Sequence, residues 1–484
     1  MQEYQINNEV LSAKKFQRDA FSALNDIQLR RNFKRAMDGL MEKRQAVFTD
    51  AEEWQQLREL GRSIRASALR KLPDLLEKLE SNCRKNGIQV HWAESIDEAN
   101  ALVLEIAQRH DVKSVVKGKS MVSEEMELNH FLEQHGIEAL EADLGEYIIQ
   151  VDHELPSHII MPAIHKNKDQ IAQMFHEKVD AEAHAETAEE MTALARKVLR
   201  QKFYEADMGV SGVNFAVAET GTLCLVENEG NGRFCTTLPP VHVAVMGIEK
   251  VVERFEDVPP LLSLLTRSAT GQAITTYFNM ISGARKSEEK DGPHEVHLIL
   301  LDNGRSRIHS DALLQETLLC IRCGACMNHC PVYSRIGGHA YDTTYPGPIG
   351  KILTPQLKGL HKAGHLADAS SLCGACVEVC PVKIPITDIL LRLRHDKVGD
   401  QQTITLAKSG GWKAKIERMV WKSWAMVFSN PKLYRLKSLA IAKMGNLAPD
   451  WLPILRNWTS VRSTPRFAKK SLHQMVREEG ISDD

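Results

Sequence analysis

The chain has 484 residues, of which 43% are hydrophobic and 26% charged, and its formal net charge is −2. This composition is that of an ordinary globular protein of about two to four domains, and the small net charge argues against nucleic acid as the main partner. The first residues show no basic stretch followed by an apolar one, and no apolar run approaches about 18 residues. We therefore expect a cytoplasmic protein without a secretory signal or a spanning helix.

Residues 1–86 are predicted to form an N-terminal helical region. In the stretch FQRDAFSALNDIQLRRNFKRAMDGLMEKR, apolar residues recur at steps of three and four, and charged residues fill the positions between them. This spacing gives a helix one apolar face for packing and one charged face for solvent.

Residues 87–305 are predicted to form an α/β domain. Short strand-like runs at 88–93, 114–118 and 137–143 alternate with helical patterns at 96–109 and 123–135. This alternation predicts a parallel sheet covered by helices on both faces. Further strand-like runs are found at 214–228, 241–252 and 295–304. The Thr220-Gly221 pair inside the first of these indicates a turn between two strands.

Residues 306–396 contain two cysteine runs, with helical patterns before the first and after the second. The runs are Cys320-x2-Cys323-x2-Cys326-x3-Cys330-Pro331 and Cys373-x2-Cys376-x3-Cys380-Pro381, which hold seven of the ten cysteines. The first spacing is that of bacterial ferredoxins, in which three cysteines ligate one iron–sulfur cluster and the fourth ligates a second cluster. Zinc sites also use C-x2-C pairs, but the tight four-cysteine run favours iron–sulfur.

The cross-ligation pattern of ferredoxins assigns the seven cysteines to two clusters. Cluster 1 is predicted to take Cys320, Cys323, Cys326 and Cys380, and cluster 2 to take Cys330, Cys373 and Cys376. Cys83, Cys224 and Cys235 lie outside both runs and are expected to have no special role.

Cluster 2 lacks a fourth thiolate, because the corresponding position holds Ser370, followed by Ser371. Three outcomes are open: a [3Fe–4S] cluster; a [4Fe–4S] cluster with a serine oxygen, water or partner group on the fourth iron; or a ligand from far away in the sequence. We favour two [4Fe–4S] clusters over a [3Fe–4S] second site.

Residues 397–484 are predicted to form a basic, tryptophan-rich helical region. Positions 408–477 carry fifteen Lys or Arg against Glu417 and Asp450, together with five of the seven tryptophans. The stretch at 412–428 has an amphipathic helical pattern. It is suited to an anionic membrane surface, to an acidic partner subunit, or to packing on the cluster domain. We expect packing or partner docking, because tryptophan and arginine are common interface anchors.

The α/β domain offers one candidate ligand site. Lys117, Glu219, Asn231 and Arg233 are polar residues at the ends of predicted strands, and we consider that they border a small anion pocket. The alternative is that they lie in ordinary loops and turns, with Ser120 or Ser123 capping a helix. His158 and His165 have no accompanying ligand pattern, so no metal role is predicted for them.

The motifs VVKGKSMVSEE (115–125), DLGEYIIQ (143–150), PSHIIMPAIHK (156–166) and AETGTLCLVENEGNGR (218–233), with the two cysteine runs, resemble those of the lactate-utilisation protein B family. The likeness covers nearly the whole chain. It implies an α/β domain similar in fold to NagB, ribose-phosphate isomerase and CoA-transferase proteins. It also implies a helical dicluster ferredoxin-like module, as in succinate dehydrogenase and heterodisulfide-reductase-type subunits.

The same resemblance implies an iron–sulfur subunit that relays electrons while L-lactate is oxidised to pyruvate. Its partners would be a cysteine-rich subunit and a second subunit with a lactate-utilisation domain, and its electron acceptor is unknown. The sequence contains no G-x-G-x-x-G after a strand, so we do not expect the chain to oxidise lactate alone. Two alternatives are a stand-alone hydroxy-acid or CoA-type enzyme that uses the α/β domain, and a redox regulatory protein.

Overall fold

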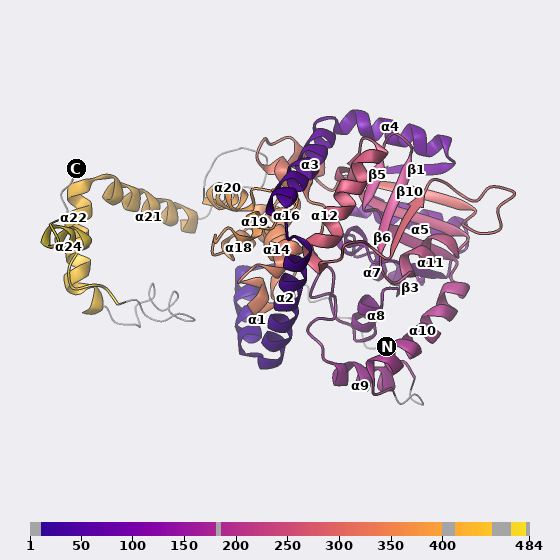
Figure 1. Ribbon diagram of the computed structural model, residues 1–484, viewed down its shortest axis with the longest axis horizontal. Helices are drawn as coiled ribbons and strands as arrows, with labels where there is room; N and C mark the ends of the chain where they lie inside the picture. The colour runs from indigo at the N-terminus through magenta and orange to yellow at the C-terminus, as the bar shows by residue number, and fades with distance from the viewer. Residues whose placement is uncertain (1–10, 181–184, 399–411, 448–465, 481–484) are drawn as a thin grey trace. The chain divides into compact units, whose positions relative to one another are not determined.

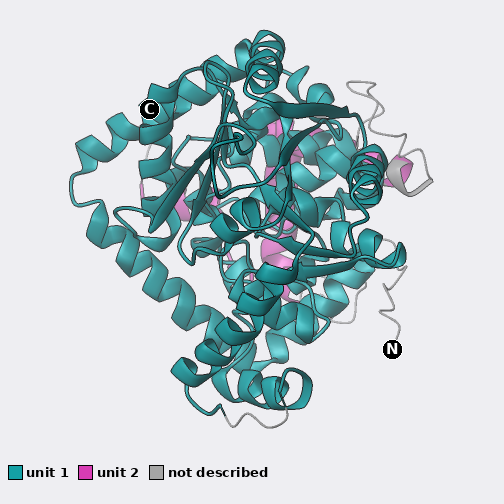
Figure 2. Cartoon of the chain, turned by 90° about the vertical axis from the view of Figure 1, so that its right-hand side faces the viewer, with its two compact units in different colours: residues 1–397, 402–407 teal, residues 398–401, 408–484 magenta. Residues whose placement is uncertain are grey.

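The computed structural model describes residues 11–180, 185–398, 412–447 and 466–480. It divides into two compact units, which are coloured separately in Figure 2. One unit comprises residues 1–397 and 402–407, and the other comprises residues 398–401 and 408–484. The predicted segments 1–86, 87–305 and 306–396 therefore share one compact unit.

Four helices begin the first unit, in agreement with the helical pattern of the sequence (Figure 1). They are α1 (Ala13–Asn25), α2 (Ile27–Val47), α3 (Ala51–Arg70) and α4 (Leu72–Lys85). The side chains of Ser12, Asp26 and Asp50 accept hydrogen bonds from free backbone N–H groups at the starts of the first three helices. Apolar residues of α2, α3 and α4 are buried in a core shared with the sheet and the cysteine-rich region.

A six-stranded parallel sheet forms the centre of the first unit, with strand order β1-β10-β7-β4-β2-β3. The strands are β1 (Ile88–Ala93), β2 (Ser114–Lys117), β3 (Glu138–Glu141), β4 (Met208–Gly212), β7 (Val241–Gly247) and β10 (Glu295–Leu301). Side chains on opposite faces enter different cores, as strand alternation requires.

Helices cover both faces of this sheet, as the alternation of strands and helices predicts (Figure 1). One face packs against α5 (Ile96–Arg109), α6 (Met121–Glu125) and α7 (Leu128–Gln134). Another core contains residues of α8 (Leu144–Val151), α9 (Lys168–Lys178), α10 (Ala188–Glu205) and α11 (Asn231–Thr237). Residues 123–135, predicted to be one helix, form parts of two, because Glu127 adopts a left-handed conformation with φ of 52° between them.

A second sheet has the strand order β8-β5-β6-β9 and was not predicted. Its strands are β5 (Phe215–Val217), β6 (Thr222–Glu227), β8 (Val251–Val252) and β9 (Tyr277–Ile281). β5 and β6 form an antiparallel hairpin, and Gly221 supplies the positive φ of the predicted turn. The connections include η1 (Ile248–Lys250), η2 (Phe255–Asp257) and α12 (Val258–Thr270).

The cysteine-rich region consists of short helices, and its described residues from Arg305 to Val398 include no strand. The elements are α13 (Arg305–His309), η3 (Leu314–Leu319), α14 (Ala325–Asn328), α15 (Tyr333–Ile336), η4 (His339–Tyr341), α16 (Gly347–Lys358), α17 (Leu360–Ala363), α18 (His365–Asp368), α19 (Ala375–Glu378) and α20 (Ile386–Val398). The segment before Cys320, predicted to be helical, forms a 3₁₀ helix. The specific likenesses to NagB-type folds and to helical ferredoxins stay predictions.

The second unit contains α21 (Trp412–Ser429), α22 (Pro431–Met444), η5 (Gly445–Leu447) and α24 (Leu472–Glu478). Within this unit, Trp421 is 54% exposed and Trp424 is 48% exposed. Trp451 and Trp458 lie outside the described residues. In the parts of the chain that the structure describes, no helix has the length and apolar character needed to cross a membrane.

Candidate metal centres

The two cysteine runs adopt the same backbone conformation. In the first run, Arg322 and Gly324 have positive φ values of 61° and 84°; fifty positions later, Leu372 and Gly374 have values of 54° and 83°. A one-turn helix follows in each run, α14 in the first and α19 in the second. A positive φ costs a non-glycine residue conformational energy, so its recurrence marks a loop shape that the site requires. By this correspondence Ser370 occupies the place of Cys320.

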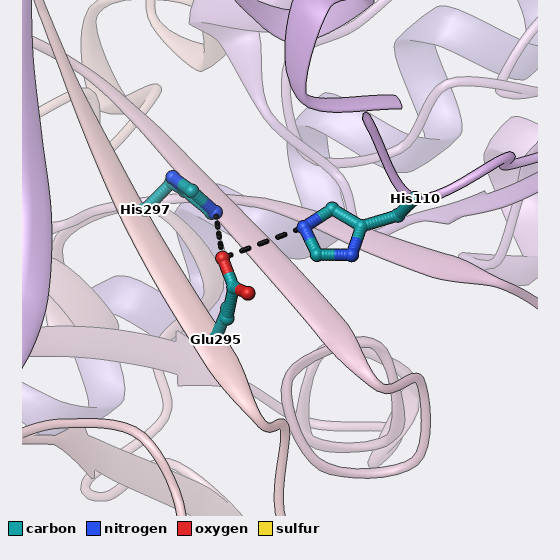
Figure 3. A group of neighbouring side chains, drawn as sticks. All are labelled: His110, Glu295 and His297. Atoms are coloured by element: carbon teal, nitrogen blue, oxygen red, sulfur yellow. Dashed lines mark ion pairs between the residues drawn. The ribbon is translucent and has the colours of Figure 1, made fainter. Parts of the chain in front are cut away.

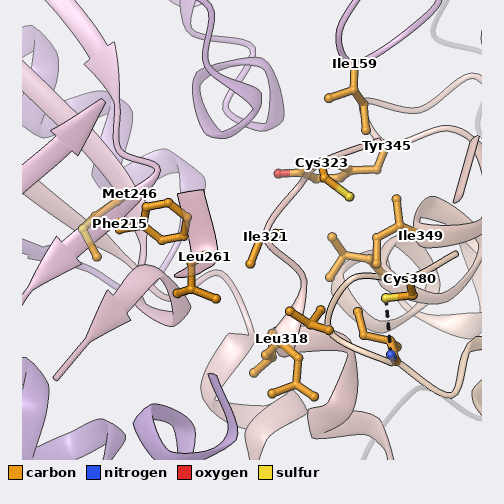
Figure 4. Close-up of a cluster of buried hydrophobic side chains, with 14 of the residues drawn as sticks. Ile159, Phe215, Met246, Leu261, Leu318, Ile321, Cys323, Tyr345, Ile349 and Cys380 are labelled. Atoms are coloured by element: carbon orange, nitrogen blue, oxygen red, sulfur yellow. Dashed lines mark hydrogen bonds between the residues drawn. The ribbon is translucent and has the colours of Figure 1, made fainter. Parts of the chain in front are cut away.

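Four thiols lie around the first cavity. Its lining includes Cys320, Cys323, Cys326 and Cys380, so a cysteine of the second run joins three of the first. Figure 4 shows Cys323 and Cys380 beside Ile321 and Ile349, whose side chains give the cavity apolar walls. The grouping is the one that the ferredoxin spacing predicts for cluster 1, and four thiols in a largely apolar cavity suit a [4Fe–4S] cluster.

Three thiols and two hydroxyl groups lie around the second cavity. Cys330, Cys373 and Cys376 line it together with Ser370 and Ser371. This is the grouping predicted for cluster 2, and both serines line the same cavity. Thiolates are the preferred ligands of iron–sulfur clusters, and a hydroxyl oxygen is a harder donor that can complete the set.

Backbone N–H groups point at several of these sulfur atoms. The N–H of Arg322 donates to Cys320 Sγ at 3.4 Å, and the N–H of Ile384 donates to Cys380 Sγ at 3.3 Å. The N–H of Leu372 donates to Ser370 Oγ at 3.2 Å. The last contact repeats the first one fifty positions later, with an oxygen in place of the sulfur.

A buried cation also approaches one of the thiols. Lys351 of α16 is 1% exposed, and its Nζ donates to Cys330 Sγ at 3.4 Å. Burial raises the pKa of the Cys376 thiol to about 12, so an ionised thiolate there needs nearby positive charge. A metal cluster together with Lys351 would supply such charge, which is consistent with a cluster site.

A buried ion-pair network joins the first cavity to the sheet. Arg322, between Cys320 and Cys323, lies 3.3 Å from Glu249, which follows β7. Glu249 also pairs with Arg305, which follows β10, at 2.7 Å. The carboxyl ends of two central strands therefore position the loop of the first cysteine run.

The predicted anion pocket is not assembled in the structure. Lys117 is 1% exposed, and its Nζ pairs with Glu124 and Glu141 at 2.6 Å each, so its charge is already neutralised. Glu219 lies at the β5–β6 turn, whereas Asn231 and Arg233 follow the opposite end of β6. A six-residue strand spans roughly 17–20 Å, which separates Glu219 from the other two. Of the two serines considered as helix caps, Ser120 caps α6, and Ser123 lies within that helix.

The two histidines of the apolar 158–165 segment have separate partners. His158 is buried, and its Nε2 lies 3.2 Å from Asn328 Oδ1. His165 contacts Glu154. The isolated cysteines are all buried, and burial raises the pKa of Cys83 and of Cys224 to about 12.

Sequence reasoning did not identify Lys351, Glu249 or Arg305 as neighbours of the cysteine sites. Lys351 and Arg305 lie near the cysteine runs in the sequence, but charged residues are usually at the surface, and nothing in their local pattern indicates burial. Glu249 is followed by Lys250 in an otherwise apolar run. This pair of opposite charges within an apolar run was the one sequence feature that could have indicated a buried functional role for Glu249.

Fold and cavities together define an α/β protein with an iron–sulfur region. Comparison with family models agrees with this class: the LUD domain matches residues 76–301, and the 4Fe-4S dicluster domain matches residues 316–384. A third family, "Lactate utilisation protein B, C-terminal", matches residues 392–481.

Relatives in three Bacillus species resemble the chain over almost its whole length. "Lactate utilization protein B" of Bacillus pumilus (strain SAFR-032) is 43% identical, over 97% of this chain and 98% of the relative. Proteins of the same name from Bacillus cereus (strain AH820) and Bacillus thuringiensis (strain Al Hakam) are 42% identical at the same coverage. The chain therefore belongs to the lactate utilization protein B family.

Among solved structures, a DUF162 family protein from Deinococcus radiodurans matches 48% of this chain and 98% of its own length. The identity is 12% and the TM-score 0.28, which is too low to establish a common fold.

Proposed function

We propose that this chain holds two [4Fe–4S] clusters and relays electrons in the oxidation of L-lactate to pyruvate by a complex of several subunits. The observation that carries the proposal is the position of Cys380 in the cavity of Cys320, Cys323 and Cys326. Cross-ligation of this kind belongs to dicluster ferredoxins. The link to lactate rests on the relatives, which are named lactate utilization protein B.

In this proposal, two groups of cysteines would each hold one cluster. Cys320, Cys323, Cys326 and Cys380 would hold the first cluster, and Cys330, Cys373 and Cys376 the second. Bound in these cavities, iron–sulfur clusters supply one-electron transfer. Lys351 would offset the negative charge at the second site, and the apolar walls of the first cavity would limit access of water to its sulfur atoms.

We further propose that Ser370 Oγ fills the fourth protein position at the second site. Its support is the repeated loop conformation and the repeated N–H contact to the residue at the start of each run. A neutral hydroxyl is a weaker donor than a thiolate, so the fourth iron would be held less tightly than the other three.

In this proposal, the oxidation of lactate requires partner subunits. The expected partners are a cysteine-rich subunit and a second subunit with a lactate-utilisation domain, and one of these would contribute the site that oxidises lactate. The second unit offers exposed Trp421 and Trp424 next to many basic residues, which suits docking to an acidic partner surface.

The first experiment is anaerobic electron paramagnetic resonance with iron and sulfide counts on the purified chain. About eight irons per chain, with signals that appear only on reduction, are expected for two [4Fe–4S] clusters. About seven irons and a strong signal before reduction would instead indicate a [3Fe–4S] second site. A Cys380→Ser variant should perturb the first site, whereas Cys83→Ser, a buried cysteine outside both cavities, should leave the iron content unchanged.

The relay function needs a separate test. The chain alone should show no cluster reduction with lactate, and the chain mixed with its partner subunits should show reduction at the rate of pyruvate formation. Lactate turnover by the isolated chain would contradict the proposed role and would favour a stand-alone enzyme.

A further inference from the structure

Two histidines and a glutamate converge at the amino-terminal edge of the parallel sheet. Glu295 and His297 lie two residues apart at the start of β10, and His110 is the residue that ends α5. Figure 3 shows the Glu295 carboxylate between the two imidazole rings. The cysteine runs follow the opposite, carboxyl-terminal edge of the sheet, so this cluster is separate from both thiol-lined cavities.

The distances between these groups match the spacing of neighbouring ligand atoms around one metal ion. Glu295 Oε2 is 3.4 Å from His110 Nε2 and 3.3 Å from His297 Nε2, and one ligand atom from each residue lies within 4.8 Å of the others. Ligands at about 2.1 Å from a tetrahedral zinc ion are about 3.4 Å apart. The two nitrogen–oxygen distances are therefore those of adjacent ligands on one such ion.

Glu295 lies within ion-pair distance of both rings, but neither contact is a well-aligned hydrogen bond. His110 Nε2 and His297 Nε2 are both buried and have no hydrogen-bond partner, although a carboxylate oxygen is close to each. Buried polar atoms without partners are rare. A cation bound between the carboxylate and the two rings would satisfy both ring nitrogens.

Neighbouring residues hold the ligands in orientation. His91 Nε2 lies 3.1 Å from His297 Nδ1, and Gln89 Nε2 donates to Glu295 Oε2 at 2.9 Å. The His91 contact can fix the proton of His297 on Nδ1, which leaves Nε2 free to bind. Such supporting contacts are typical of metal sites.

We propose that His110, Glu295 and His297 bind a divalent cation of the zinc class. Two imidazole nitrogens and one carboxylate oxygen suit zinc and exclude magnesium and calcium, which prefer oxygen ligands. His110 and Glu295 have 25% and 36% of their side-chain surface exposed, so the group lies near the surface of the sheet edge. The proposal does not depend on the clusters or on lactate.

The test uses the purified chain with its clusters intact and zinc ion as the probe. Zinc and iron are counted by mass spectrometry after equilibrium dialysis at a series of free zinc concentrations. Unmodified protein should bind one zinc per chain beyond its iron. His110→Ala and Glu295→Gln should bind it at least tenfold more weakly, with the iron content unchanged. His294→Ala is the matched control, because His294 is adjacent in sequence and contacts Arg285 instead.

Two results would overturn the proposal. One is the absence of zinc binding beyond the iron content; the other is equally tight binding by His110→Ala and Glu295→Gln. Zinc-edge X-ray absorption of the unmodified protein gives an answer even if a variant fails to fold. Nitrogen and oxygen neighbours are expected, whereas sulfur neighbours would mean that zinc had entered the cysteine sites.

Discussion

At the first position of the cysteine repeat, the two halves differ by one side-chain atom. Where the first run has the sulfur of Cys320, the second has the oxygen of Ser370, in the same loop conformation and with the same backbone donor two residues on. Because the local geometry is repeated, the chemistry of the donor atom would decide how firmly the proposed second cluster holds a fourth iron.

Replacing Ser370 tests this directly. Ser370→Cys should give a second site that retains four irons under mild oxidation, since a thiolate binds iron more strongly than a hydroxyl. Ser370→Ala should shift the second site toward three irons, seen as a signal in the oxidised state. Ser371→Ala, at the neighbouring cavity-lining position, is the control. Equal iron counts in Ser370→Ala and unmodified protein would show that Ser370 is not a ligand.

Lys351 should raise the reduction potential of the second site. Its buried ammonium donates to Cys330 Sγ at 3.4 Å, and this favours the more negative, reduced cluster. A charge-assisted contact of about 1.4 kcal/mol corresponds to about 59 mV for one electron. Lys351→Met should therefore lower one of the two potentials by about 60 mV in a redox titration. Lys358→Met, an exposed position on the same helix, should change neither; equal potentials in both variants would contradict the role.

At the scale of elements, β4 shows how packing overrides a weak local pattern. Its sequence MGVSG contains two glycines and was not recognised as a strand, yet every residue of β4 is buried. Gly209 faces α11 so closely that a Cβ atom there would lie 1.8 Å from the Cys235 carbonyl oxygen. Helix α11 can pack on this strand because Gly209 has no side chain.

Gly209→Ala should therefore reduce stability. Overpacking of a tight core costs about 1–3 kcal/mol, and the carbonyl it meets cannot move without shifting α11. Gly39→Ala is a matched contrast, because nothing lies within 4 Å of a Cβ at that position of α2, and alanine in a helix interior gains up to about 1 kcal/mol. Urea unfolding under anaerobic conditions measures both, and equal effects would refute the packing argument.

At the scale of the whole first unit, buried charges connect the sheet to the cysteine-rich region. Arg305 binds Glu125 of α6 and Glu249 after β7, and Glu249 in turn contacts Arg322 beside Cys320. Burial by itself would raise the pKa of Glu249, but Arg305 and Arg322 outweigh it and lower this pKa to about 2. The sheet and the first cluster site are thus expected to unfold together.

Glu249→Gln should cost about 3 kcal/mol of unfolding free energy, because it leaves buried arginine charge without its partner. The folded-state pKa lies below the ordinary value of 4.5, so this stabilisation is fully present above about pH 4.5 and is lost as pH falls toward 2. The loss in the variant should accordingly be the same at pH 5.5 and pH 7.5 in urea unfolding. Glu256→Gln, an exposed position, is the control, and a much smaller loss at pH 5.5 would contradict an ionised Glu249.

The sequence by itself determined those features that depend on local spacing. Strand β1 and helix α5 have the bounds that their periodicity predicts, because burial on one face imposes a fixed repeat on neighbouring residues. The cysteine spacing likewise predicted which thiols would share a cavity, because a cluster requires its ligands at fixed reach.

Only the tertiary structure decided features that join residues distant in sequence. His110 and Glu295 are 185 positions apart, and strand order alone brings them together. The pairing of β2 with β3 likewise sets Glu141 beside Lys117, and this ion pair takes Lys117 out of the predicted anion pocket. Neither the neutralisation of a charge nor the convergence of ligands leaves a local pattern, because each depends on which strands become neighbours when the sheet forms.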